Sequence, residues 1–192
     1  MKNLSLFILC AGIAACHPSD GCHSWTEGTV AFIYINDPFH LFSDEETDII
    51  LASCQEWEDA TNGHIVCQLT NRSDIDNLIT ITPDSKKHIQ EETGHGAVTN
   101  FSPFECGGDI IIPYDLNEEI FRLVLLHEIG HSLGLDHDHY GTIMYPAVGQ
   151  PLPGIISGLI DKYPTEITCD DVCQFCEFND CYCGDLPPCE KE

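Results

Sequence analysis

Four residues in one short stretch, His127, Glu128, His131 and His137, carry side chains that could bind a metal ion and promote hydrolysis. On a helix, His127 and His131 would leave the same face one turn apart, so both imidazoles could ligate one zinc ion. Glu128 would point beside the metal and could take a proton from a zinc-activated water. Gly134 has no Cβ, so the chain could turn back there in a left-handed conformation and bring in His137. Three protein ligands leave a fourth position for water, as in a catalytic zinc site.

This stretch resembles the zinc signature of the metzincin metalloproteases, H-E-x-x-H-x-x-G-x-x-H. Met144, within Gly141-Thr142-Ile143-Met144-Tyr145-Pro146, resembles the Met-turn of the same group. Among metzincins, Met144-Tyr145-Pro146 and Gly134-Leu135-Asp136-His137 are most similar to the matrixin family. The resemblance implies a zinc-dependent endopeptidase with one catalytic Zn²⁺ on His127, His131 and His137. It further implies Glu128 as general base for a zinc-activated water, Met144 as an apolar floor under the zinc, and a peptide or protein as substrate.

Two other functions fit the same motif. One is a non-catalytic zinc-containing surface module whose cysteine-rich tail binds a partner. The other is a small-molecule zinc hydrolase on the same fold. Cleavage of a mixed peptide library, blocked by a hydroxamate chelator, would separate a peptidase from the binding module.

One feature departs from the matrixin pattern. Matrixins usually hold a second, structural zinc with histidines on and before the fourth and fifth strands, but 97–101 and 109–112 contain no histidine. We therefore expect a single zinc. We interpret the remaining histidines of the domain as surface residues: His40, His64, His88, His95 and His139.

The order of apolar and polar segments predicts an α+β fold. β-branched and aromatic runs predict five strands, at 30–35, 65–69, 78–82, 97–101 and 110–112. Capping boxes predict one helix from Ser43 to Asn62-Gly63, the zinc helix after Asp115 and Glu118, and a last helix from Thr168 with Asp171. Residues 86–96 are polar and predict a loop. The order resembles a metzincin-type catalytic domain over 29–178, with a twisted mixed sheet of about five strands, a zinc-carrying active-site helix, a Met-turn and a C-terminal helix.

The N-terminus predicts export. Residues 1–15 have a short basic start and an apolar run too short to span a bilayer. They end in Ile13-Ala14-Ala15-Cys16, which resembles a bacterial lipobox, so we expect a lipoprotein signal peptide, a lipid on Cys16 and a tether over 16–28. The protein would then be anchored in the cell envelope, at the outer membrane if the host has one. Secretion without a lipid is the alternative.

Cysteine is abundant, with 12 residues in the chain. Apart from Cys10 and Cys16, ten remain, and an even number in an exported protein predicts five disulfides. Residues 179–192 would form a cysteine-rich, disulfide-pinned tail. The alternatives are a second metal site on Cys173, Cys176, Cys181 and Cys183, or an inhibitory Cys183 thiolate on the zinc.

The chain is strongly acidic, with 32 Asp and Glu against 7 Lys and Arg. Phosphates would be repelled, so we expect no nucleic-acid partner. We interpret the acidic excess as a solvated, salt-tolerant surface, with Ca²⁺ sites or a preference for cationic substrates as the alternative. We expect a monomer.

Overall fold

A computed structural model describes residues 25–93, 97–100, 106–139, 141–146, 165–179 and 181–189. The expected signal peptide, Cys16 and the first part of the expected tether, 16–24, lie outside the described residues. Five strands form one sheet: β1 Thr29–Ile35, β2 Ile65–Leu69, β3 Leu78–Asp84, β4 Val98–Asn100 and β5 Gly108–Pro113. The helices are α1 Asp44–Ala60, α2 Lys86–Thr93, α3 Glu118–Ser132 and α4 Cys169–Asn179. The α+β prediction is confirmed.

The sheet is mixed and has the order β2-β1-β3-β5-β4. β1, β2, β3 and β5 run parallel, and β4 pairs antiparallel with β5 at the edge. Side chains alternate along each strand, so Ile79 and Ile81 of β3 and Ile110 and Ile112 of β5 are buried in the core. β4 lies at the edge of the sheet, and among the described residues no strand pairs with the other side of its backbone.

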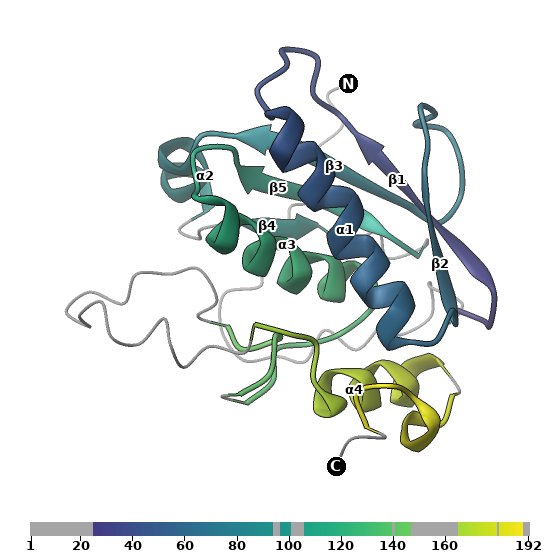
Figure 1. Cartoon of the computed structure of the whole chain (residues 1–192). Helices are drawn as coiled ribbons and strands as arrows, with labels where there is room; N and C mark the ends of the chain where they lie inside the picture. Colours follow the sequence, from purple (N-terminus) through teal and green to yellow (C-terminus); the bar gives the residue numbers. More distant parts are fainter. Residues whose placement is uncertain are drawn as a thin grey trace, which may run out of the picture.

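The helices α1 and α3 lie on one face of this sheet and contact each other (Figure 1). α1 begins with the expected capping box, in which the Ser43 side chain accepts from the Glu46 N–H and Glu46 Oε2 accepts from the Ser43 N–H. Trp57 of α1 is fully buried and donates its indole N–H to the Leu126 carbonyl of α3 at 3.0 Å. This contact ties α3 to α1 and the rest of the core.

Two local predictions are wrong. Of the segment predicted as a loop, 86–96, residues 86–93 form α2, because the Ser85 side chain accepts from the His88 N–H at 3.2 Å and Ile89 is buried. The cap of α3 is Asn117, whose Oδ1 accepts from the Ile120 N–H at 2.9 Å. Asp115 instead accepts from the Lys86 N–H, so its carboxylate lies at the start of α2.

α4 and the tail form one disulfide-bonded unit. Its bonds are Cys169–Cys189, Cys173–Cys183 and Cys176–Cys181. These pairs contradict both alternatives for the tail, the second metal site and the inhibitory Cys183 thiolate. The short 3₁₀ helix η2, Cys183–Asp185, lies in this tail, and Leu186 packs into the main core.

The remaining described cysteines are Cys54, Cys67 and Cys106. Cys54 of α1 is bonded to Cys67 of β2, and Cys106 is also disulfide-bonded. All nine cysteines in the described part of the chain are therefore oxidised. The expected set of five disulfides also needs Cys22, which lies outside the described residues.

Trp25 is part of the packed domain. Its side chain is 2% exposed, and its backbone N–H donates to Asn179 Oδ1 of α4 at 2.8 Å. The tether expected over 16–28 can therefore extend only to residue 24, because Trp25 is packed into the domain.

Among the described residues, no helix is both long and apolar enough to cross a membrane.

Candidate metal centre and its supporting residues

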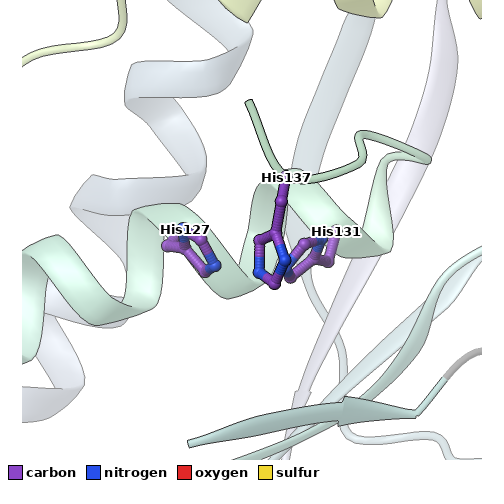
Figure 2. A group of neighbouring side chains, drawn as sticks. All are labelled: His127, His131 and His137. Atoms are coloured by element: carbon purple, nitrogen blue, oxygen red, sulfur yellow. The ribbon is translucent and has the colours of Figure 1, made fainter. Parts of the chain in front are cut away.

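Three histidine rings converge beside α3 (Figure 2). His127 and His131 stand one turn apart on the helix, and Gly134, at φ +98°, turns the chain so that His137 faces them. One ligand atom from each histidine lies within 4.8 Å of the others. The ring centroids are 4.6 Å apart for His127 and His131, 5.2 Å for His127 and His137, and 4.8 Å for His131 and His137. All three imidazoles can thus reach one ion.

Backbone carbonyls orient two of these rings. His127 Nδ1 donates to the Ile143 carbonyl and His131 Nδ1 to the Leu135 carbonyl, each at 2.8 Å. With Nδ1 engaged in this way, Nε2 is the nitrogen of each ring that can ligate a metal. Burial lowers the pKa of His127 to about 3 and that of His131 to about 4, so both rings are neutral donors at neutral pH. Neutral, oriented imidazoles are the donor set that zinc takes, so the residues fit the ion.

Glu128 lies between the two histidines in sequence but is directed to a different partner. Its carboxylate Oε2 accepts a hydrogen bond from the Thr99 hydroxyl of β4. Burial raises the pKa of Glu128 to about 7, and the Thr99 hydrogen bond acts in the opposite direction. A carboxyl group with a pKa near neutrality can both accept and return a proton.

Met144 packs directly under the helix turn that carries His127 and His131. Met144 is fully buried, and a Cβ added at Gly130 would lie 2.4 Å from its Sδ and 3.1 Å from Trp57 Cζ2. A side chain at position 130 would therefore force Met144 or Trp57 to shift, and glycine lets the Met-turn approach the helix this closely. The sequence predicted no role for Gly130, because it occupies a variable position of the H-E-x-x-H motif and has no side chain that could bind a metal or transfer a proton.

Asp171 holds the Met-turn in place from α4. Its Oδ2 accepts from the Ile143 N–H at 3.1 Å and its Oδ1 from the Met144 N–H at 3.2 Å. It also makes the predicted capping pair with Thr168, whose hydroxyl donates to Oδ2 at 2.7 Å. Burial raises the pKa of Asp171, while the hydrogen bonds from Thr168, Ile143 and Met144 oppose this shift. The sequence indicated only the capping role of Asp171, and its contact with the Met-turn was missed.

Comparison with known proteins places this site in a family. A sequence profile described as Matrixin matches residues 24–155, which include the histidines, Glu128 and Met144. The chain belongs to the matrixin family. It is 28% identical over 140 residues to human Matrix metalloproteinase-26, a match that covers 67% of this chain and 52% of that protein. This matrixin thus spans about half the length of that curated relative.

A solved structure, titled "Structure of myroilysin", is also similar to this matrixin. The sequence identity is 14%, the TM-score is 0.43, and the match covers 73% of this chain and 69% of that chain.

Among the described residues of this matrixin, the other histidines stand apart from the group of His127, His131 and His137. His88 is exposed and bonds to Asp84, and His139 is exposed and bonds to Asp138 and Asp170. His40 is exposed, and His95 lies outside the described residues. His64 is not a plain surface residue: its Nε2 lies 2.7 Å from the Trp25 carbonyl and its ring packs against Phe175.

A second cluster of possible ligands in the described part of this matrixin consists of Cys169, Cys173 and Cys189. All three cysteines are already bonded in disulfides, so their sulfurs are not thiolate ligands. In the described ranges, the three histidines are therefore the group whose chemistry fits zinc.

Proposed function

We propose that this matrixin is a zinc-dependent endopeptidase. The observation that carries the proposal is the convergence of three imidazoles on one point, with a buried carboxylate on the same helix turn. Two of the rings, those of His127 and His131, are neutral and oriented by backbone carbonyls. A purely structural zinc site would have no use for Glu128, because a fourth protein ligand normally closes such a site. Membership in the matrixin family supports the same activity.

The histidines His127, His131 and His137 would hold the zinc through ring nitrogens. When bound, zinc would act as a Lewis acid that polarises a peptide carbonyl and makes a nearby water more acidic. Glu128 would accept a proton from the attacking water and return it to the leaving amine. Its raised pKa, caused by burial, suits this exchange near neutral pH.

The edge strand β4 is the expected binding site for the substrate backbone. β4 pairs on one side with β5, and an extended peptide could add to its other side through main-chain hydrogen bonds. Thr99 of β4 contacts Glu128, so a peptide on this edge would lie next to the general base.

Glu128→Gln tests the proposed activity. It keeps the size of the side chain but removes the base, so cleavage of a mixed peptide library should fall roughly 10²- to 10⁴-fold. Zinc content and thermal melting should stay near those of the wild type. Glu119→Gln, an exposed change on the same helix, is the matched control and should cleave at the wild-type rate. A zinc-loaded, oxidised wild type that cleaves nothing in the library would favour the non-catalytic binding module.

We also propose an exported, lipid-anchored monomer. The apolar run that precedes Cys16 supports export and anchoring. The oxidised state of every described cysteine supports export. Cys16→Ser should abolish fatty-acid labelling, and intact-mass analysis should find the lipid on wild-type Cys16. A mature chain that begins elsewhere without a lipid would exclude the anchor.

The acidic surface has three further proposed consequences. The excess of 32 acidic over 7 basic residues would favour cationic substrates, and Ca²⁺ could bind some of the carboxylates. It would also disfavour nucleic acid as a partner.

A further inference from the structure

The hydroxyl of Thr99 bridges the edge strand and the zinc helix. Thr99 lies in the middle of β4 and is half-buried. Its Oγ1 donates to Oε2 of Glu128 on α3. The strand proposed to bind the substrate is thus directly bonded to the carboxylate proposed to act as base.

The hydroxyl has one hydrogen, and the carboxylate is its better acceptor. Thr99 Oγ1 also lies 3.2 Å from the backbone carbonyl of Glu128. That carbonyl receives another donor, Ser132 Oγ, at 3.3 Å. Hydrogen bonds to a charged carboxylate are shorter and stronger than those to a neutral carbonyl. The Thr99 hydroxyl therefore donates its hydrogen to Glu128 Oε2 rather than to the Glu128 backbone carbonyl.

Packing around β4 holds Thr99 in this orientation. Thr99 is opposite Ile110 in the β4–β5 register. A Cβ added at Gly108 would lie 3.4 Å from Thr99 Cγ2 and 3.0 Å from the Asn100 carbonyl. Because Gly108 lacks that atom, β4 can lie close to β5, and the methyl of Thr99 packs toward Gly108 while its hydroxyl faces α3.

We propose that Thr99 is a positioning residue that orients the Glu128 carboxylate toward the water that attacks the peptide. Thr99 keeps its own proton throughout and exchanges none with the substrate. By holding Oε2, it leaves Oε1 as the oxygen that can accept from the water, and it limits the rotamers of a side chain that otherwise has several. This inference rests on the proposed peptidase function.

The test compares Thr99→Val, which keeps the branched shape, with Thr99→Ser, which keeps the hydroxyl. Thr99→Val should lower kcat about 10-fold or more, as expected for the loss of a hydrogen bond to a charged group, while KM stays within about 3-fold. Thr99→Ser should recover most of kcat. Thr80→Val, the same change at a half-buried position of β3, is the matched control and should leave kcat and KM unchanged.

Two kinetic results would overturn the proposal. One is a kcat for Thr99→Val equal to that of the wild type. The other is a higher KM with unchanged kcat, which would mean that the substitution disturbs only the binding edge. Zinc content should be the same in all variants, so that loss of metal does not account for a lower rate.

A second measurement, on metal-free protein, needs no turnover. The urea midpoint should fall when Thr99→Val leaves the Glu128 carboxylate without its donor, and fall less when the same change is made in a Glu128→Leu background. Equal shifts in both backgrounds would show that the hydrogen bond is absent and would overturn the proposal. If the shifts differ as expected but the wild type cleaves no peptide, the contact is established, while the proposed function and with it the positioning role are rejected.

Discussion

Replacing Asp171 by asparagine is expected to loosen the Met-turn and, through it, the histidine cluster. Asp171 Oδ2 accepts from the Ile143 N–H, the Thr168 N–H and the Thr168 hydroxyl, at 3.1, 2.9 and 2.7 Å. Oδ1 accepts from the Met144 N–H at 3.2 Å. Asparagine keeps one oxygen, which would stay where three donors meet. Its amide nitrogen would then face the Met144 N–H, and two donors cannot bond to each other.

The magnitude follows from that one lost acceptor. A buried donor without a partner costs about 1–3 kcal/mol in the free energy of unfolding. For a domain of this size, that corresponds to a decrease in Tm of roughly 2–12 °C. The Ile143 carbonyl also orients His127, so zinc affinity should fall about 10-fold, the lower end of the usual effect of residues that support metal ligands.

The assay is a thermal melt of metal-free protein, together with a zinc titration against a competing chelator. Asp170→Asn is the matched control, because Asp170 neighbours Asp171 in the helix but is exposed and pairs only at the surface with His139. An exposed ion pair contributes about 0–1 kcal/mol, so the control should melt within a few degrees of the wild type. If Asp171→Asn melts and binds zinc like the control, Asp171 does not support the Met-turn in the way described.

Two further predictions concern the histidines. Wild-type protein should contain one equivalent of zinc, and His127→Ala, His131→Ala and His137→Ala should each lose it; metal analysis that finds two equivalents would contradict the single-site assignment. His88 should titrate by NMR above its ordinary pKa of 6.5, because the Asp84 carboxylate accepts a hydrogen bond from its ring and attracts its positive charge. The stabilisation from this pair is present below pH 6.5 and is lost as pH rises through the raised pKa, and Asp84→Asn should return the His88 midpoint toward 6.5.

The convergence of the three histidines was predictable because they are close in sequence and their types are specific. His127 and His131 need only helical geometry to meet, and Gly134 supplies the turn that brings in His137. Asp171 and Thr99 were not predictable in the same way. Each meets its partner through tertiary packing, Asp171 across 27 and 28 residues and Thr99 across 29. An aspartate in a helix cap or a threonine in a strand is common, so neither residue type signals a contact with a metal site.

The strands and long helices were predictable from apolar periodicity, but the short elements were not. α2 has one buried apolar residue, Ile89, so its sequence lacks the repeating pattern that indicates a helix. Its start depends on Ser85, a single capping residue among many polar ones. The cap of α3 fell on Asn117 rather than Asp115 because several polar residues at that point could cap, and the docking of α2 beside Asp115 decides among them.

The cysteine-rich tail supports the metal centre without contributing a ligand. Three cysteines of α4, Cys169, Cys173 and Cys176, lie at helical spacing along one side and are bonded to the tail. Asp171 and Phe175, on the same helix, are buried against the rest of the domain. The disulfides constrain the unfolded chain and so favour the folded α4. A short terminal helix would otherwise fray, and Asp171 lies in its first turn. The tail therefore keeps Asp171 in place, and Asp171 accepts hydrogen bonds from the Ile143 and Met144 N–H groups of the Met-turn. The Ile143 carbonyl of the Met-turn in turn orients His127.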